Sequence, residues 1–222
     1  MQLSGATVGV LGGTGPQGKG LAYRWARSGL RVLIGSRDAA RAEATAASLR
    51  ELAGVGTNVS GAANADCAAA ADLVLVAVPW DGHAATVEAL REPLAGKIVI
   101  DCVNPLGFDG QGPYPLRVQE GSAAQQAASL LPSSVVTAAF HHVSAVLLAD
   151  PALDKIDTDV LVLGDDRDAV AVVIELASAI PGVRGVYGGR LRNAGQVEAL
   201  TANLIAINRR YSAHAGIRVT DI

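Results

Sequence analysis

Short apolar runs alternate with stretches of helical periodicity along most of this chain. The runs at residues 7–11, 31–34, 73–78 and 98–102 predict β-strands, and the alanine-rich stretches between them predict α-helices. The run at 73–78 is apolar without alternation, as in a strand that is buried on both faces of a sheet. Because strands and helices take turns, we expect βαβ units and a parallel sheet.

The remaining elements follow from the same periodicities and from the signals that start and stop helices. In the first half we expect helices at residues 19–28, 38–52 and 84–94, a short helix through Cys67 and a weak strand at 58–60. In the second half we expect strands at 135–140, 160–163 and 183–187, a helix at 122–131 with Ser122 and Gln125 as a capping box, a helix from an N-cap at Asp168 to Pro181, and a long helix at 194–213. These elements predict a Rossmann-like, doubly wound, mainly parallel α/β sheet with a small C-terminal α/β annex.

Residues 104–119 interrupt the alternation. They contain Pro105, Pro113 and Pro115 among three glycines and show no periodicity. A loop of this length in a compact domain is usually either functional or disordered, so we expect an irregular segment here.

The long helix predicted at residues 194–213 is apolar around most of its circumference. Val197, Leu204 and Ile207 follow helical spacing, and Ile205 widens the apolar face. A helix of this kind is usually buried on several sides, which one domain of this size does not readily provide. The pattern therefore favours a homodimer.

Composition narrows the class of protein. Half of the 222 residues are hydrophobic but only 4% are aromatic, so we expect a core of aliphatic residues and alanines. A net charge of −3 argues against a nucleic-acid-binding protein, and no apolar run is long enough to cross a bilayer. The first residues contain no signal segment, and two cysteines are too few for a disulfide framework. We expect a soluble, cytoplasmic protein.

Residues 12–18 form a glycine-rich stretch between the first predicted strand and the first predicted helix. Gly13, Gly15 and Gly18 match the G-x-G-x-x-G spacing of dinucleotide-binding turns, and this context makes the match informative. The spacing serves a tight turn, a close approach of backbone to a pyrophosphate, and close packing of helix on strand. A flexible glycine hinge is the plainer alternative. We interpret this stretch as a pyrophosphate-binding turn at a helix N-terminus, made of Gly13, Thr14, Gly15, Pro16, Gln17 and Gly18.

The end of the second predicted strand distinguishes between the two nicotinamide dinucleotides. Enzymes of this fold that use NAD usually place Asp or Glu there, against the ribose 2′-hydroxyl. Here Ser36 and Arg37 occupy that position, and Arg41 lies one turn into the next helix. A hydroxyl and two guanidinium groups can bind a 2′-phosphate, which a carboxylate would repel. We therefore predict NADP(H) as a cofactor; the alternative is a helix-capping serine followed by two solvated arginines.

Further candidate residues follow the fourth and fifth predicted strands, because ligands of doubly wound sheets lie beyond the carboxyl ends of the strands. Pro79, Trp80 and His83 follow the fourth strand, and Asn104 follows the fifth. We expect them to flank the cofactor, although Trp80 is equally well explained as ordinary packing.

A histidine pair, His141 and His142, ends the sixth predicted strand on the same side of the sheet. Such a pair suggests acid–base chemistry or a metal. No third ligand of suitable spacing accompanies it, so we expect no metal site. No arrangement of side chains suggests a nucleophilic catalytic triad.

Motifs spread over nearly the whole chain match one known family. They are Val10-Leu11-Gly12-Gly13-Thr14-Gly15, Gly18-Lys19-Gly20-Leu21-Ala22, Gly35-Ser36-Arg37, Val78-Pro79-Trp80, Phe140-His141-His142-Val143-Ser144-Ala145, Val197-Glu198-Ala199-Leu200-Thr201 and Gly216-Ile217-Arg218. In these motifs the chain resembles the coenzyme F420-dependent NADP oxidoreductases. Residues 104–118 match the family poorly, and Pro16 and Gln17 occupy positions that often differ among its members.

The resemblance implies a reversible hydride transfer between the nicotinamide C4 of NADP(H) and the deazaflavin C5 of coenzyme F420. Such a transfer needs neither a protein nucleophile nor a metal. Carried over by motif, residues 14–17 would bind the pyrophosphate, and Ser36, Arg37 and Arg41 would bind the 2′-phosphate. The residues implied along the NADP are Trp80, Asn104 and Ala145, and those implied at the deazaflavin are His141, Val143, Ala215 and Gly216.

The same resemblance suggests a division of the chain. Residues 1–140 would form the NADP-binding Rossmann domain, and residues 141–222 a smaller C-terminal domain that completes the F420 site and carries dimer contacts. Within that second part, His141 is the candidate for positioning the deazaflavin ring or supplying a proton.

Two other functions stay open at the level of sequence. An NADPH-dependent reductase of a small imine or carbonyl compound would share the N-terminal fold, and would need a proton donor, for which His141 is the candidate. A non-catalytic NADPH-binding protein is also compatible with the fold, because a fold does not determine function.

Overall fold

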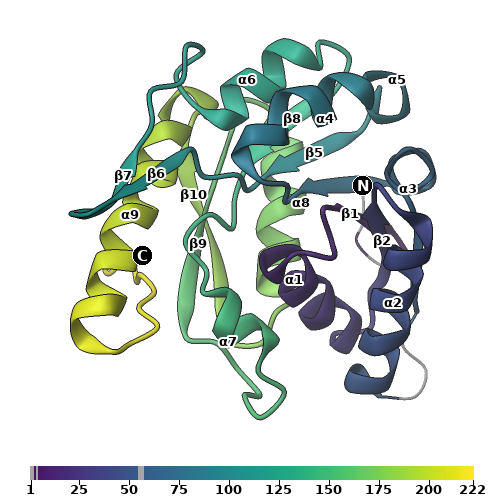
Figure 1. Cartoon of the computed structure of the whole chain (residues 1–222), viewed down its shortest axis with the longest axis horizontal. Helices are drawn as coiled ribbons and strands as arrows, with labels where there is room; N and C mark the ends of the chain where they lie inside the picture. The colour runs from purple at the N-terminus through teal and green to yellow at the C-terminus, as the bar shows by residue number, and fades with distance from the viewer. Residues whose placement is uncertain (1–2, 4, 55–57) are drawn as a thin grey trace.

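A computed structural model describes residues 3, 5–54 and 58–222 of the chain (Figure 1). In this part of the chain an eight-stranded sheet has the order β10-β9-β8-β5-β4-β1-β2-β3. Its strands are β1 (Thr7–Leu11), β2 (Arg31–Ser36), β3 (Val59–Ala63), β4 (Leu73–Val76), β5 (Ile98–Asp101), β8 (Val135–Ala138), β9 (Thr158–Gly164) and β10 (Val183–Gly189).

Within this sheet, neighbouring strands are parallel along the spatial order β3-β2-β1-β4-β5-β8. This is the doubly wound order of a dinucleotide-binding sheet. Strand β9 runs antiparallel to β8, and β10 runs parallel to β9. The predicted fold class is confirmed. Because β9 and β10 extend the same sheet, the sheet itself is continuous across residue 140, and the division into two domains at that residue stays a prediction.

Helices cover both faces of the sheet. One apolar layer contains α1 (Pro16–Arg27), α2 (Ala39–Ala53) and α8 (Arg167–Ser178), with α7 (Ala145–Ala149) against α1. The opposite layer contains α3 (Asn64–Ala70), α4 (His83–Ala89), α5 (Arg91–Leu94), α6 (Ala123–Leu130) and part of α9 (Ala194–Tyr211). Short 3₁₀ turns, η1 (Trp80–Gly82) and η2 (Leu191–Asn193), precede α4 and α9.

The alternation of side chains along β4 explains why its run is apolar throughout. Leu73 and Leu75 belong to one apolar layer, whereas Val74 and Val76 belong to the other, and all four side chains are fully buried. A central strand of a two-sided parallel sheet has no solvent-facing side, as the sequence predicted.

Three details of the helices differ from the sequence prediction. The first helix begins at Pro16 rather than near residue 19, and the helix expected at 84–94 is divided into α4 and α5 around Leu90. The N-cap of α8 is Asp166, whose carboxylate accepts a hydrogen bond of 2.8 Å from the Ala169 N–H; the predicted cap, Asp168, lies inside the first turn.

Residues 106–115 form a β-hairpin where we expected an irregular loop. Strands β6 (Leu106–Asp109) and β7 (Gly112–Pro115) pair antiparallel and lie beside α9, at the end of the molecule away from α2 (Figure 1). Gly112 has a φ of +120°, and Asp109 accepts a hydrogen bond of 2.8 Å from the Gln111 N–H in the turn. Prolines are tolerated in this ribbon because both of its strands are edge strands, which need only part of their N–H groups.

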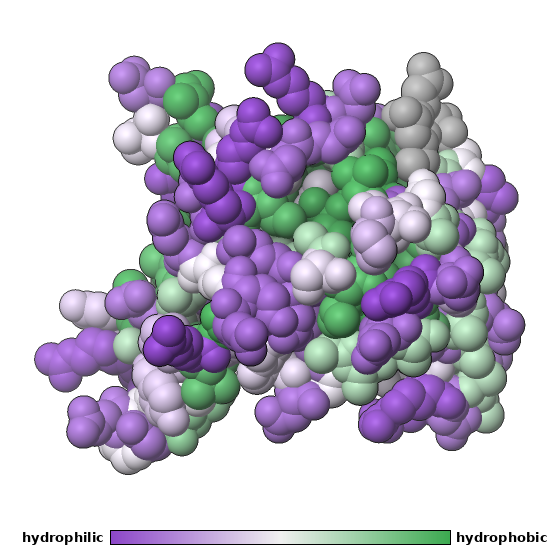
Figure 2. Space-filling model, turned by 90° about the horizontal axis from the view of Figure 1, so that it is seen from above, coloured by the Kyte–Doolittle hydropathy of each residue, from purple (hydrophilic) through white to green (hydrophobic). Residues whose placement is uncertain are grey.

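The surface is mixed in character. Figure 2 shows apolar residues gathered near the centre of one face, with strongly polar residues lying around them. Among the helices that the structure describes, none has the length and hydropathy needed to cross a membrane.

Candidate functional site

The turn between β1 and α1 is shaped by glycines. Gly12 has a φ of +73°, and a Cβ there would lie 2.5 Å from the Ala77 carbonyl oxygen, so the turn excludes larger residues. The left-handed residue is thus one position before the first glycine of the motif. A Cβ at Gly18 would lie 2.9 Å from the Gly12 carbonyl oxygen, which explains how closely α1 packs on β1. Helix α1 has no side-chain N-cap, so backbone N–H groups of its first turn are available to an anion.

A first cavity, of about 680 Å³, opens between this turn and the carboxyl ends of β2 and β4. The structure brings eight of the predicted cofactor residues together there. They are Thr14, Gly15, Pro16, Gln17, Ser36, Arg37, Arg41 and Pro79.

At one end of the first cavity lie the guanidinium groups of Arg37 and Arg41, neither of which is in an ion pair with another described residue. Ser36 is buried, and its Oγ accepts a hydrogen bond of 3.3 Å from the Asp38 N–H. Asp38 caps α2, since its Oδ1 accepts from the Ala40 N–H at 2.9 Å. Arg37 and Arg41 are exposed and form no side-chain ion pair with any residue in the described ranges. The two arginines are therefore free to bind a phosphate.

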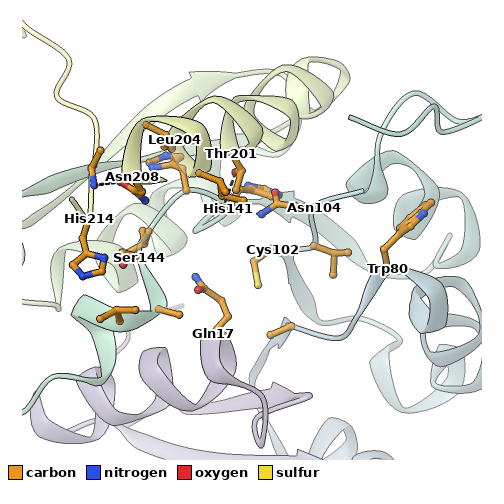
Figure 3. Close-up of a pocket in the computed structure, with 18 of the residues that line it drawn as sticks. Gln17, Trp80, Cys102, Asn104, His141, Ser144, Thr201, Leu204, Asn208 and His214 are labelled. Atoms are coloured by element: carbon orange, nitrogen blue, oxygen red, sulfur yellow. Dashed lines mark hydrogen bonds between the residues drawn. The ribbon is translucent and has the colours of Figure 1, made fainter. Parts of the chain in front are cut away.

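A second cavity, of about 440 Å³, adjoins the first, because Gln17, Ala77, Val78 and Pro79 line both. Figure 3 shows Gln17 pointing from α1 towards the middle of this cavity, with Trp80 and His214 on opposite sides. Besides Gln17 and Pro79, the predicted residues that line it are Trp80, Asn104, His141, Val143, Ala145 and Ala215.

The segment that follows β8 forms one wall of the second cavity and is held in a strained backbone conformation. Phe140 has a φ of +67°, which is uncommon for a residue with a side chain, and its ring is buried against Trp25 at 5.5 Å. The Phe140 carbonyl accepts a hydrogen bond of 3.1 Å from Gln17 Nε2. The His141 carbonyl accepts from Asn104 Nδ2 at 2.8 Å and from Thr201 Oγ1 at 3.0 Å.

Both histidines of this wall are neutral at pH 7. His141 and His142 are each 4% exposed, and burial lowers the pKa of each to about 4. His142 Nε2 accepts a long hydrogen bond of 3.5 Å from the Leu161 N–H, which leaves the ring proton on Nδ1. Each ring therefore offers one N–H donor without carrying a charge.

Several polar atoms of this wall are buried without a partner among the described residues. They are both ring nitrogens of His141, Nδ1 of His142 and Oδ1 of Asn104. An unsatisfied buried polar group costs about 1–3 kcal/mol, and a cluster of them suggests a group that the protein binds. The mixture of donors and an acceptor fits the edge of a polar heterocycle better than it fits an apolar ligand.

The last residues of the chain complete the second cavity. His214 and Ala215 line it, and the Ala215 N–H donates to Asn208 Oδ1 at 2.6 Å. Further along, the buried carboxylate of Asp159 binds Arg184 at 2.7 Å and accepts from the Val219 N–H at 2.7 Å. We refer to residues 212–222 as the C-terminal tail.

Four predicted residues do not line either cavity. The prediction that His83 flanks the cofactor is wrong, because its ring is fully buried beneath the cavity wall, where it binds Asp101. Gly216 packs on Thr158, where a Cβ would lie 2.5 Å from Thr158 Oγ1. Gly13 and Gly18 shape the turn from behind, against β1 and β2.

Sequence reasoning missed the contribution of α9 to the second cavity. Thr201, Leu204, Ile205 and Asn208 line it, at the spacing of one helical face. The width of the apolar face was interpreted as a dimer contact. The available signal was the pair of polar residues, Thr201 and Asn208, seven positions apart on an otherwise apolar face.

Asn64 was also missed. It starts α3 directly after β3 and lines the first cavity beside Ser36, and its Oδ1 has no hydrogen-bond partner in the described ranges.

Glu198, one turn before Thr201 on α9, is buried at the N-terminus of α6. Its two carboxylate oxygens accept hydrogen bonds from the Ala123 N–H at 3.0 Å and the Ala124 N–H at 3.2 Å. Burial raises the pKa of Glu198 to about 7, although these two hydrogen bonds oppose the shift.

The unfolding free energy of the wild type, relative to that of the Glu198→Gln variant, is expected to fall as the pH rises from about 4.5 to about 7. The folded pKa of Glu198 lies above its ordinary value, so the folded protein keeps a proton that the unfolded chain loses. The stabilisation is complete below pH 4.5 and declines as the pH rises through about 7, by on the order of 3 kcal/mol. Urea unfolding of both proteins at several pH values measures this difference, in which the titration of other groups cancels; a difference that does not change with pH would contradict the shift.

Metal-binding side chains do not gather in the part of the chain that the structure describes, where no group of three or more His, Cys, Asp or Glu residues could hold an ion. The two cysteines, Cys67 and Cys102, are buried and free.

A doubly wound sheet with a glycine turn at the carboxyl end of β1, and with cavities along the same edge, defines a Rossmann-fold dinucleotide-binding protein. Residues 7–105 match the model of a family described as NADP oxidoreductase, coenzyme F420-dependent. An F420-dependent NADP reductase from Methanothermobacter thermautotrophicus is 41% identical over 221 residues, which cover 97% of this chain and 95% of the relative. The chain belongs to the family of F420-dependent NADP reductases.

Two further comparisons agree with this assignment. The F420-dependent NADP reductase of Methanocaldococcus jannaschii is 38% identical over 223 residues, which cover 97% of this chain and 98% of the relative. The solved structure of a protein from Arthrobacter sp. FB24, proposed to be an F420-dependent NADP reductase, superimposes with a TM-score of 0.79 at 30% identity and covers 97% of this chain and all of the other. The resemblance expected from the sequence is confirmed.

Proposed function

We propose that this protein transfers hydride reversibly between NADP(H) and the deazaflavin coenzyme F420. The observation that carries the proposal is the pair of adjoining cavities, whose common wall is Gln17, Ala77, Val78 and Pro79. Two ring systems that exchange a hydride must meet at contact distance, and orientation supplies much of the rate. Because the cavities adjoin at these residues, a dinucleotide bound in the first can extend its nicotinamide into the second, where the other ring would meet it.

The first cavity is suited to the phosphates of NADP(H). The free N–H groups of the first turn of α1 would bind the pyrophosphate, and Gly15 lets the backbone approach it. Ser36, Arg37 and Arg41 would bind the 2′-phosphate. These assignments rest on position and chemistry together.

The second cavity is suited to the nicotinamide and the deazaflavin. When bound, the two rings supply the carbon that gives the hydride and the carbon that takes it. Trp80, Asn104 and Ala145 would lie along the nicotinamide side, and His141 and Val143 along the deazaflavin. The unpaired polar atoms of this wall would bind the heteroatoms of the rings.

His141 is better suited to positioning a ring than to supplying a proton, because it is neutral at pH 7. We expect His141→Ala to lower kcat/KM for F420 about tenfold, the equivalent of one lost hydrogen bond, without moving the pH profile of the reaction. Steady-state rates measured from about pH 6 to pH 9 give both quantities. A profile displaced by the substitution would instead assign His141 the proton transfer.

One assay separates the proposed activity from its alternatives. The protein is mixed with NADPH and oxidised F420, and the loss of deazaflavin absorbance is followed. Rapid bleaching supports the proposal. Tight NADPH binding without bleaching overturns it. Turnover of a small imine or carbonyl compound would then identify an NADPH-dependent reductase of such compounds. Absence of any turnover would identify a non-catalytic NADPH-binding protein.

The remaining expectations belong to the same proposal. We infer a cytoplasmic homodimer that associates through α9 and the β6–β7 hairpin, and a C-terminal region from residue 141 onwards that completes the F420 site. Ile207 and Tyr211 are 40% and 73% exposed on α9, and Phe108 is 67% exposed on the hairpin beside it. Sedimentation equilibrium of the wild type and of a Tyr211→Glu variant tests the association.

A further inference from the structure

His83 is a fully buried histidine behind the wall of the second cavity. It begins α4, and both of its ring nitrogens have partners. Nε2 lies 2.6 Å from Asp101 Oδ2, and Nδ1 lies 3.0 Å from Gln126 Oε1. Asp101 ends β5 and is also fully buried.

The hydrogen bonds around His83 define its protonation state. Gln126 Nε2 donates to Glu120 Oε2 at 3.3 Å, and this places Gln126 Oε1, an acceptor, against His83 Nδ1. The Asp101 carboxylate is also an acceptor. A ring that faces acceptors on both nitrogens must donate from both, so His83 is an imidazolium.

The charges around His83 favour the same state. Burial by itself lowers the pKa of His83, but the hydrogen bond to Asp101, the charge of Asp101 and the hydrogen bond to Gln126 together raise it above its ordinary value. Glu198, on α9, adds a further attraction when ionised. His141 also interacts with Asp101, but it is neutral at pH 7.

The neutral thiol of Cys102 completes the surroundings of this pair. Burial raises the pKa of Cys102, and the charge of Asp101 raises it further. The charged groups that face the ring therefore come from β5 and α9, with Glu120 acting through Gln126 of α6.

The imidazolium supports two parts of the cavity wall. Trp80 stacks on the His83 ring, with centroids 5.5 Å apart and planes 29° from parallel. On the other side, Asp101 Oδ1 accepts a hydrogen bond of 3.0 Å from the Val103 N–H. Trp80 and Val103 both line the second cavity.

We propose that His83, as a buried imidazolium, is a positioning residue that holds Trp80 and residues 102–104 in the wall of the cofactor cavity, so that NADPH binding weakens when His83 loses its proton. Its place in catalysis rests on the proposed function. The binding of NADPH and the state of Trp80 can be measured without F420.

Asp101→Asn removes the negative charge beside His83 while it retains the size and shape of the side chain. The amide can keep the hydrogen bond from the Val103 N–H through Oδ1 and donate through Nδ2 to His83 Nε2, which then carries no proton. The shape of the site is retained, and the imidazolium loses its counter-ion. Asp66→Asn, an exposed position on α3 outside both cavities, is the matched control.

Tryptophan emission reports the protonation of His83 directly. The chain has two tryptophans, and Trp80→Phe leaves only Trp25, which is buried against Phe140. An imidazolium in contact with an indole quenches its emission. In the wild type we expect the Trp80 contribution to increase with pH, with a midpoint above 6.5, and NADPH affinity to fall several-fold over the same range.

In Asp101→Asn the midpoint is expected to fall by about one pH unit or more, and NADPH affinity at pH 7 to fall about fivefold to the value of the wild type at high pH. Asp66→Asn should keep the wild-type midpoint. Glu198→Gln should keep a transition, which separates His83 from the other group that titrates nearby.

An unchanged midpoint in Asp101→Asn, or a Trp80 transition with no change in NADPH affinity, would overturn the proposal. If Asp101→Asn does not fold, Glu120→Gln provides the second variant, because it frees the Gln126 amide to turn and must lower the midpoint as well. If NADPH binding and Trp80 emission titrate together but F420 is not reduced, the proposed function fails and the role of His83 stands.

Discussion

Replacing Arg37 with glutamate is expected to weaken NADPH binding about 100-fold or more, while NADH binding changes by less than about threefold. The substitution removes a free guanidinium group from the charged end of the first cavity and places a carboxylate there. A charge-assisted hydrogen bond to phosphate contributes about 1.5–3 kcal/mol, and repulsion between the new carboxylate and the 2′-phosphate adds to its loss. NADH has a hydroxyl at that position, which a carboxylate can bind.

Dissociation constants for both dinucleotides, measured at one fixed ionic strength, decide the matter because exposed charges are screened by salt. Arg192→Glu is the control: it makes the same charge change at an exposed residue that lines neither cavity. Equal losses for NADPH and NADH, or an equal effect at Arg192, would mean that Arg37 does not bind the 2′-phosphate.

Replacing Arg24 with methionine is expected to lower the unfolding free energy by about 3–5 kcal/mol, and so the melting temperature by roughly 10 °C. Arg24 is 1% exposed on α1. Its guanidinium donates to four backbone carbonyls, those of Leu147 at 2.6 Å, Leu148 at 2.8 Å, Asp150 at 2.8 Å and Leu153 at 2.6 Å. Methionine fills part of the space but leaves these carbonyls without a donor.

Arg27→Met, one turn further along α1, is the matched control. Arg27 forms an exposed ion pair of 2.8 Å with Asp154, and pairs of this kind contribute at most about 1 kcal/mol. Thermal and urea unfolding of the two variants therefore separate a buried arginine from an exposed one. Equal losses would contradict the role assigned to Arg24, which is to fix the segment containing α7 against α1.

The order of strands and the place of the site could be predicted because both depend on local patterns. An apolar run such as 73–78 has few other ways to be buried, and a glycine turn between strand and helix fixes where phosphates bind. Helix boundaries were less accurate because several nearby residues give similar signals. Asp165, Asp166 and Asp168 are all good caps, and only the path of the chain into α8 selects Asp166.

The part of the second cavity that α9 supplies could not be predicted from local patterns, whereas Trp80 and Asn104 could be, because they follow strands of the sheet. Thr201 and Asn208 become site residues because α9 packs across the carboxyl edge of the sheet, and this is a tertiary fact. The β6–β7 hairpin has no alternating apolar pattern because most of its residues stay partly exposed and α9 supports it. The buried pair of His83 and Asp101 likewise depends on two residues eighteen positions apart in the chain.

The C-terminal tail lines the second cavity but not the first, so the two cavities can change independently in evolution. His214 and Ala215 reach the second cavity from a segment without helix or strand, and its anchors on Asp159 lie in another part of the sheet from the glycine turn. Substitutions between residues 212 and 215 therefore alter the room for one ring while the residues around the dinucleotide phosphates keep their places. Natural selection can therefore change the part of the second cavity that the tail forms without weakening the binding of the dinucleotide phosphates.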